Sequence, residues 1–367
     1  MYLKHLSILN YKICSDAELP FCNGVNCFSG NNGEGKTNFL DAIYYLSFCK
    51  SFFNPLDSQN VKVGEKFFMI KGHYDRNNQE EVVQCSIKQG QKKQVKRNKK
   101  EYTKLSDHIG VFPLVMISPS DNALIIDGSD VRRKFIDGII SQYNKNYLES
   151  LLRYNKVLVQ RNSLLKYFAK ERKFDKVGLE VYNEQLIQYG TLIYEERKSF
   201  LEEFIKLFQA NYNYISGDNE RVDLTYDSHL NDKSFEVLLG ESIEKDRMLN
   251  HTSVGIHKDD LHFKIKDFSV KKFASQGQQK SYLVALKLAQ FEFIKKIKNV
   301  KPIILLDDIF DKLDGRRGKR IMQLISDHQF GQIFITDTNL DRLKDMFNDI
   351  SVEQCYFDVK DGGAVNA

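Results

Sequence analysis

Residues 30–37 read Gly30-Asn31-Asn32-Gly33-Glu34-Gly35-Lys36-Thr37, which is the pattern G-x-x-x-x-G-K-T. Glycines at these positions allow backbone N–H groups to turn inward and wrap a polyphosphate. In such a loop Lys36 reaches the terminal phosphates, and the Thr37 hydroxyl is placed to bind Mg²⁺. The apolar run at 24–29 and the helical apolar spacing at 38–48 predict a strand before the loop and a helix after it. All eight residues are therefore predicted to form a P-loop that binds ATP and Mg²⁺.

A second part of the nucleotide site is predicted near the carboxyl end of the chain. The apolar run Ile303–Leu306 is typical of a strand buried on both faces of a parallel sheet, and it ends in Asp307-Asp308. Acids at the carboxyl end of such a strand lie where ligands bind. We expect Asp307 to bind Mg²⁺ together with Thr37. Asp308 and Lys36 are the candidate catalytic residues, with Asp308 orienting or deprotonating the attacking water. The alternative is a pair of solvated acids at the end of a strand.

The distance between these motifs predicts the domain organisation. Thr37 and Asp307 are 270 residues apart (307 − 37), which is long for a compact P-loop domain and indicates a large insertion. From about 129 to 211 the chain has no proline, and its apolar residues recur at the spacing of three or four long helices. We predict an ATPase lobe built from 1–120 and 251–360, an inserted helical lobe at 121–250, and a disordered tail at 361–367.

The composition is that of a packed protein of one or two domains. The chain has 367 residues, of which 42% are hydrophobic, and a net charge of +5, which is compatible with nucleic-acid binding. Its six cysteines form no C-x-x-C pair, so we expect reduced core thiols and no zinc site. No signal-peptide pattern and no run of 18 apolar residues is present. We therefore expect a cytoplasmic protein with no membrane partner.

A third motif, Ser275-Gln276-Gly277-Gln278, leads into a predicted helix. Ser275 is a candidate N-cap, and Gly277 leaves room for a close approach. Alone this would be a capped loop. Together with the P-loop, the strand ending in Asp307-Asp308 and the following Asp311–Asp314, the set resembles the ABC-type ATPase head, with its Walker A, signature, Walker B and D-loop motifs. The resemblance implies an α/β fold, namely an ABC-type P-loop ATPase head with an inserted, mainly helical lobe and no long coiled coil.

Among ABC-type heads, the chain resembles the RecF family over nearly its whole length. Besides the motifs above, four segments carry the resemblance: Ser118–Asp121, Gly128 with Arg132–Asp137, Tyr154–Asn162 and Gly255–Asp260. The resemblance implies that ATP held by Lys36, Thr37 and Asp307 is covered by Ser275, Gly277 and Gln278 of a second subunit. ATP would then drive formation of a homodimer that clamps DNA, and slow hydrolysis would release it.

The same resemblance implies partners and a cellular role. The expected DNA partners are duplexes and single-strand/duplex junctions, and the expected protein partners are RecR and RecO. The role would be recombinational DNA repair and replication at gaps and stalled forks, in the SOS response, by helping to load the RecA strand-exchange protein. Such a protein would be associated with the nucleoid.

The chain departs from the family pattern at several positions. Phe53 stands where the family often has an arginine, and Ile256 and Lys258 replace a proline and an arginine. Many ABC ATPases have a glutamate at the position of Asp308 and a histidine within 336–338, where this chain reads Thr-Asp-Thr. These departures predict a weak ATPase that acts as a switch, and the family resemblance implies that DNA stimulates it.

Two sets of basic residues are candidates for DNA contact. The first is a predicted hairpin with six basic residues among nine: Lys92, Lys93, Lys96, Arg97, Lys99 and Lys100. The second comprises Arg132, Arg133 and Arg161 in the helical lobe. The alternative for the hairpin is a solvated surface, and the alternative for the arginines is pairing with acids such as Asp137.

Three other functions are alternatives, and the sequence argues against the first two. An ABC transporter ATPase subunit would usually carry a shorter insertion and a Leu-Ser-Gly-Gly-Gln signature. An SMC-like structural ATPase would need an insertion of hundreds of residues with heptad repeats, which this chain lacks. A nucleotide-gated scaffold without significant ATPase activity fits the same motifs, and measured ATP turnover separates it from a working ATPase.

Overall fold

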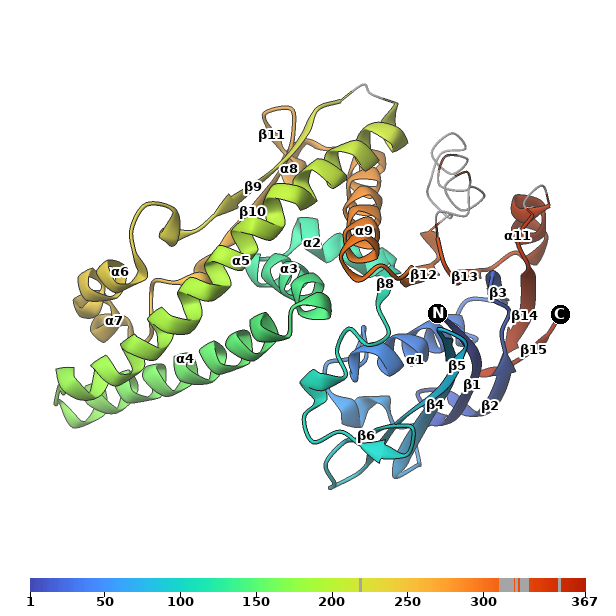
Figure 1. Ribbon diagram of the computed structural model, residues 1–367, viewed down its shortest axis with the longest axis horizontal. Helices are drawn as coiled ribbons and strands as arrows, with labels where there is room; N and C mark the ends of the chain where they lie inside the picture. The colour runs from blue at the N-terminus through green and yellow to red at the C-terminus, as the bar shows by residue number, and fades with distance from the viewer. Residues whose placement is uncertain (218–219, 310–319, 321–322, 324–329, 349–350) are drawn as a thin grey trace. The chain divides into compact units, whose positions relative to one another are not determined.

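The computed structural model describes residues 1–217, 220–309, 320, 323, 330–348 and 351–367, with helices and strands labelled as in Figure 1. The chain divides into two compact units. Unit 1 contains Met1–Asp121, Tyr214–Gly217 and Gln276–Ala367, and unit 2 contains Asn122–Asn213 and Asp218–Ser275. Unit 2 therefore runs to Ser275, whereas the inserted lobe was predicted to end at 250. The reason is strand pairing, because β10 (Asp260–Ile265) pairs with β9 (Val222–Asp227).

Unit 1 contains an antiparallel sheet with the strand order β2-β1-β4-β5-β6-β7. Its strands are β1 (Tyr2–Tyr11), β2 (Cys14–Pro20), β4 (Phe67–Arg76), β5 (Gln79–Lys88), β6 (Gln94–Arg97) and β7 (Lys100–Glu101). Buried residues alternate with partly exposed ones along β4 and β5, as expected for strands with one face in the core. The short helices η1 (Asp57–Asn60) and η2 (Leu105–Asp107) lie in the connections.

The second sheet of unit 1 is mainly parallel and has the order β15-β14-β3-β13-β12-β8. Its strands are β3 (Val25–Ser29), β8 (Leu114–Ile117), β12 (Ile303–Asp307), β13 (Ile333–Asp337), β14 (Gln354–Lys360) and β15 (Gly363–Asn366). The first four of these are buried at every residue, which explains why most of their residues are apolar. The expected disordered tail is wrong, because Gly363–Asn366 pairs with β14 as an antiparallel strand.

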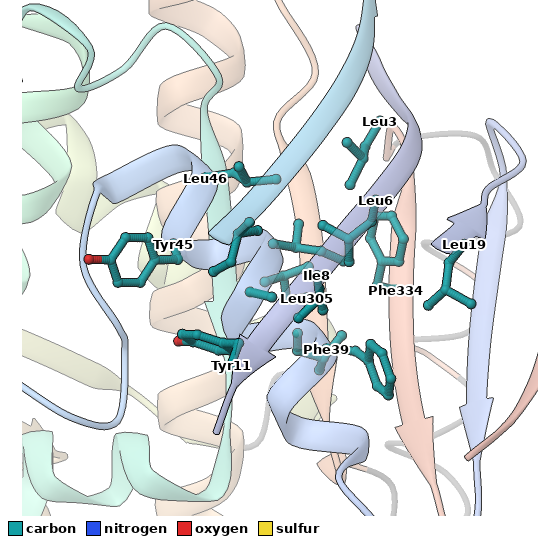
Figure 2. Close-up of a cluster of buried hydrophobic side chains, with 14 of the residues drawn as sticks. Leu3, Leu6, Ile8, Tyr11, Leu19, Phe39, Tyr45, Leu46, Leu305 and Phe334 are labelled. Atoms are coloured by element: carbon teal, nitrogen blue, oxygen red, sulfur yellow. The ribbon is translucent and has the colours of Figure 1, made fainter. Parts of the chain in front are cut away.

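The core of unit 1 surrounds helix α1 (Lys36–Phe48), which packs against strands of both sheets. Figure 2 shows Phe39 and Leu46 of α1 among Leu6 and Ile8 of β1 and Phe334 of β13. Burial of both faces of α1 fixes its start, and therefore the P-loop, relative to the parallel sheet. Two further helices of unit 1 are α9 (Gln276–Lys298) and α11 (Leu340–Phe347).

Unit 2 is mainly helical, with a small antiparallel sheet of order β11-β10-β9. Its long helices are α3 (Ser129–Tyr143), α4 (Lys145–Glu171) and α5 (Lys176–Ser216), the last of which ends in unit 1. Shorter elements are α2 (Ala123–Ile126), η4 (His229–Asn231), α6 (Phe235–Glu241), α7 (Ile243–Leu249), η5 (Ile256–Lys258), β11 (Phe268–Ser269) and α8 (Val270–Phe273). Among the described residues, no helix is both long and apolar enough to cross a membrane.

Candidate nucleotide-binding site

The predicted P-loop connects the carboxyl end of β3 to the first residue of α1. Gly30, Gly33 and Gly35 have φ values of 151°, 89° and 108°, which side-chain-bearing residues rarely adopt. A Cβ on Gly30 would lie 2.3 Å from the Val359 carbonyl oxygen, whereas a Cβ on Gly33 would meet nothing within 4 Å. The loop is thus packed at Gly30 and open at Gly33, as a cradle for a ligand requires.

Lys36 is buried at the start of α1. Its Nζ donates hydrogen bonds to the carbonyl oxygens of Gly30 at 2.7 Å and Asn31 at 2.9 Å. The ammonium group is therefore held inside the loop, where an anion seated on the loop N–H groups would meet it. This geometry fits a polyphosphate.

Asp307 and Thr37 lie in direct contact although they are far apart in the sequence. The Thr37 hydroxyl donates to Asp307 Oδ1 at 2.9 Å. Two further hydroxyls donate to the same carboxylate: Thr336 to Oδ1 at 2.9 Å and Ser118 to Oδ2 at 3.3 Å. These residues meet because β8, β12 and β13 are adjacent parallel strands, so their carboxyl ends lie at one edge of the sheet with the P-loop.

The surroundings of Asp307 suit a hard cation. Burial raises the pKa of Asp307, while the hydrogen bonds from Thr37, Thr336 and Ser118 and the charge of Lys36 act against that rise. No cluster of three or more His, Cys, Asp or Glu able to hold a metal occurs among the residues that the structure describes. One carboxylate with neighbouring hydroxyls is the donor set that Mg²⁺ uses when phosphate oxygens and water complete its shell, so the residues fit Mg²⁺.

Asp308 follows the strand in a left-handed conformation, with φ 46°. Its N–H donates to the Thr336 hydroxyl at 3.0 Å, so one hydroxyl contacts both adjacent acids. At 336–338, where many ABC ATPases have a histidine, this chain has none. Asp337 accepts a hydrogen bond from the Arg342 guanidinium. The predicted D-loop, Asp311–Asp314, falls in the part of the chain that the structure does not describe.

The carboxyl-terminal hairpin contacts the P-loop, which the sequence did not indicate. The N–H of Asp361 donates to Glu34 Oε2 at 2.6 Å, and the N–H of Gly362 donates to the Glu34 carbonyl oxygen at 2.9 Å. Gly362 has φ 77°, and a Cβ there would lie 2.7 Å from the Ile13 carbonyl oxygen. The turn between β14 and β15 thus fixes the middle of the P-loop.

The signature residues lie where the chain passes between the two units. Ser275 is exposed, ends unit 2 and directly precedes α9, at the position predicted for an N-cap. Gly277 and Gln278 are half-buried in the first turn of α9, in unit 1. Their predicted contact with a nucleotide of a second subunit remains a proposal.

The basic hairpin is confirmed as strands β5 to β7, but its six cations are not equivalent. Lys93 Nζ lies 2.6 Å from Asp57 Oδ2 and donates to the Cys49 carbonyl oxygen, and Arg97 pairs with Glu81 at 2.5 Å. No ion pair within the described part of the chain is formed by the other four cations, which are Lys92, Lys96, Lys99 and Lys100. These four are therefore the hairpin residues best suited to DNA contact, and that contact stays a prediction.

The three arginines of unit 2 that were predicted to contact DNA all bond to groups within the protein. Arg161 is fully buried and pairs with the equally buried Asp246 at 2.7 Å, so its prediction as a DNA contact is wrong. Arg132 forms a two-pronged ion pair with Asp260, at 2.6 Å and 3.0 Å. Arg133 donates to the Ser129 hydroxyl and the Asp259 carbonyl oxygen. Arg161 and Arg132 therefore pair with acids, as the alternative predicted, but the acids are Asp246 and Asp260 and not Asp137.

Asp137 instead belongs to a buried ion network around Arg197. The Arg197 guanidinium contacts Asp137 at 2.9 Å and Asp259 at 2.7 Å, and its side chain is 1% exposed. The Tyr147 hydroxyl donates a hydrogen bond to Asp137, and the Tyr226 hydroxyl donates one to Asp259. The motif residues at 132–137 and 255–260 thus hold unit 2 together.

The sequence indicated no role for four residues near this site. Ser118 and Thr336 contact Asp307 directly, whereas Asp121 contacts Ser118 and Lys287 contacts Asp121. Ser118 directly follows the apolar run of β8, in the same way as Asp307 and Asp308 close β12. A polar residue at the end of each buried parallel strand was the available signal. The strand order that makes β8 and β13 the neighbours of β12 could not be read from the sequence.

The sequence of the chain matches a known protein family over nearly its whole length. The family model described as RecF/RecN/SMC N terminal domain matches residues 2–356. A protein of Flavobacterium johnsoniae named DNA replication and repair protein RecF is 55% identical over 342 residues, covering 93% of this chain and 95% of the relative. A protein of Phocaeicola vulgatus with the same name is 52% identical over 364 residues, covering 99% and 97%.

Solved structures agree with the sequence comparison. A structure of the recombination mediator protein RecF with ATP, in the RecFOR pathway, matches with a TM-score of 0.90 and 32% identity, covering 100% of this chain and 97% of that chain. An Smc head domain of Pyrococcus furiosus matches with a TM-score of 0.58 and 16% identity, covering 100% and 96%, and this likeness shows the fold alone.

Proposed function

Because the chain belongs to the RecF family of DNA replication and repair proteins, we propose that it binds ATP at the P-loop and that ATP controls its binding to DNA. The observation that carries the proposal is the contact between Thr37 and Asp307, which joins the P-loop to the acid-bearing strand at 2.9 Å. A cytoplasmic location at the nucleoid follows from this function.

The residues of unit 1 have separate roles in this proposal. Backbone N–H groups of the P-loop and Lys36 bind the phosphates, while Thr37 and Asp307 hold the cation. Mg²⁺, when bound, would neutralise charge on the phosphate oxygens. Asp308 orients the attacking water, and its left-handed backbone is held by Thr336. An aspartate is shorter than a glutamate, and no histidine is present at 336–338, which supports slow hydrolysis that acts as a switch. ATP turnover above that of an Asp308→Asn variant separates this function from a nucleotide-gated scaffold.

We propose that ATP also joins two copies of the chain, with Ser275, Gly277 and Gln278 of one copy against the nucleotide of the other. Ser275→Arg should then leave ATP binding by the single subunit within about twofold of wild type and abolish the ATP-dependent dimer. The reason is that a bulky cation replaces a small hydroxyl at a surface that must approach a partner closely. Light scattering after size exclusion, with and without ATP, measures the dimer.

The matched control for this experiment is Ser58→Arg, which places the same side chain at another exposed serine. It should dimerise as wild type does. Normal ATP-dependent dimerisation of Ser275→Arg would contradict the role of the signature in trans.

The proposed DNA contact uses the hairpin residues Lys92, Lys96, Lys99 and Lys100. Replacing all four with Gln should weaken binding to duplex DNA and reduce the slope of log affinity against log salt by roughly one unit for each phosphate that the protein no longer neutralises. Lys93 and Arg97 stay unchanged because their ion pairs hold the hairpin. Fluorescence anisotropy over a salt series measures both quantities, on a duplex and on a duplex with a single-stranded extension.

The control variant replaces four exposed lysines of unit 2 with Gln, so that the change in net charge is equal: Lys166, Lys170, Lys173 and Lys176. If both variants lower the slope equally, the hairpin has no special part in DNA binding.

RecO and RecR are the proposed protein partners, since a similar structure is described within the RecFOR pathway.

A further inference from the structure

A series of polar contacts in unit 1 connects the acid of the nucleotide site to the middle of helix α9. It begins at Asp307 Oδ2, which accepts a hydrogen bond from the Ser118 hydroxyl at 3.3 Å. The N–H of Ser118 donates to Asp121 Oδ2 at 2.9 Å. The other carboxylate oxygen of Asp121 lies 2.6 Å from Lys287 Nζ. Three residues therefore link the metal-binding carboxylate to α9, and none of them belongs to the P-loop, Walker B or signature motifs.

The local backbone makes this series of contacts rigid. Ser118 follows the last residue of β8, and Pro119–Asn122 forms the short helix η3, which brings Asp121 back over Ser118. The N–H of Asp121 also donates to the Ser118 carbonyl oxygen at 3.0 Å, so the two residues are bonded in both directions. Ser118 is 6% exposed, and it has little freedom to turn its hydroxyl away from Asp307.

The ion pair between Lys287 and Asp121 fixes the other end. Both side chains are 6% exposed. A buried pair of opposite charges tolerates little separation, because either charge alone in the interior is strongly unfavourable. The position of α9 along β8 is consequently tied to the position of Asp121, and through Asp121 to the Ser118 hydroxyl.

The places of these residues along the chain indicate what the contacts do. Asp121 is the last residue of unit 1 before the chain passes into unit 2, and α9 begins where the chain returns. Gly277 of the signature and Lys287 lie on the same helix, about 15 Å apart along its axis. A force on the signature end of α9 would therefore act on Asp307 through Lys287, Asp121 and Ser118.

We propose that Ser118 is a positioning residue for Asp307, and that Asp121 and Lys287 hold Ser118 in place, so that helix α9 and the metal-binding carboxylate are mechanically coupled. The proposal rests on the proposed function, since it takes Asp307 as the Mg²⁺ ligand. Ser118 donates to Oδ2, while Thr37 and Thr336 donate to Oδ1. By holding Oδ2, Ser118 fixes the rotation of the Asp307 carboxylate, so that Oδ1 faces Thr37 and the P-loop.

The first test is equilibrium binding of a fluorescent ATP analogue, in EDTA and over a Mg²⁺ titration. Ser118→Ala should leave affinity in EDTA within about twofold of wild type and raise the Mg²⁺ concentration for half-saturation about tenfold, the usual effect of removing a partner of a metal ligand. Ser118→Thr keeps the hydroxyl and should restore the wild-type value. An unchanged Mg²⁺ dependence in Ser118→Ala would overturn the proposal.

The second test asks whether Lys287 acts through Ser118. Lys287→Met with Asp121→Asn removes both charges together, which avoids leaving one buried charge unpaired. This pair of substitutions should raise the Mg²⁺ requirement in the same direction as Ser118→Ala. Adding Ser118→Ala to it should have little further effect, because all three residues act through one hydrogen bond. Effects that multiply would show that Lys287 and Ser118 act separately, and so would contradict the coupling.

Two controls separate this inference from other failures. Lys296→Met changes an exposed lysine on the same helix and should leave Mg²⁺ dependence unchanged. Thermal melting shows whether each variant is folded. If the wild-type protein itself shows no Mg²⁺-dependent nucleotide binding, the proposed function fails. If wild type binds and Ser118→Ala behaves like it, only the inference fails.

Discussion

Lys36→Met should reduce ATP affinity about hundredfold or more, because two or more charge-assisted hydrogen bonds to phosphate are removed, at roughly 1.5–3 kcal/mol each. The side chain is buried in the loop, and its Nζ already bonds the carbonyl oxygens of Gly30 and Asn31. Methionine extends as far as the Cε atom of lysine, so it removes the ammonium group and leaves the apolar part of the packing intact. Isothermal titration of ATP with Mg²⁺ present measures the effect.

The control for this prediction is Lys166→Met, which removes one positive charge from the exposed surface of α4. Its ATP affinity should equal that of wild type. A Lys36→Met protein that melts normally and binds ATP with wild-type affinity would exclude the P-loop as the nucleotide site.

Arg197→Met should lower the free energy of unfolding of unit 2 by about 3–5 kcal/mol, the usual loss when one partner of a buried ion pair is removed. Two carboxylates, of Asp137 and Asp259, depend on this guanidinium. Urea unfolding followed by circular dichroism measures the change. Arg153→Met is the control, because Arg153 is 61% exposed and lies 4.0 Å from Glu149, and its removal should cost less than about 1 kcal/mol.

The destabilisation in Arg197→Met should also depend on pH. Burial raises the pKa of Asp259 even in the presence of Arg197, and removing the cation should raise it further. A carboxyl group with a folded-state pKa above its unfolded value favours the folded state at low pH, and this contribution is lost as pH rises through the folded-state pKa. The deficit relative to wild type should therefore be smaller at pH 5 than at pH 8. A deficit that is constant between these values would mean that the missing packing of the side chain, and not unpaired charge, causes it.

Local sequence patterns were enough to predict the individual parts of the site. The P-loop glycines, Lys36 and Thr37 are readable because a phosphate-binding loop needs backbone torsions that few other residues permit. The apolar run before Asp307 is readable because a strand buried on both faces has few polar positions. The length of chain between these two motifs was enough to predict an insertion, and its helical apolar spacing was enough to predict long helices, of which Lys176–Ser216 is one.

Which of the polar residues meet depends on the packing of distant segments. Ser118 and Thr336 contact Asp307 because β8 and β13 flank β12, and strand order is not written in any local pattern. The carboxyl-terminal residues are small and polar, yet they form an ordered strand because β14 offers a free edge for pairing. Arg161 and Lys92 are both basic residues in charged segments of the sequence, but one is buried against Asp246 and the other is exposed. Charge is a property of the residue, whereas burial and pairing arise only when the chain has folded.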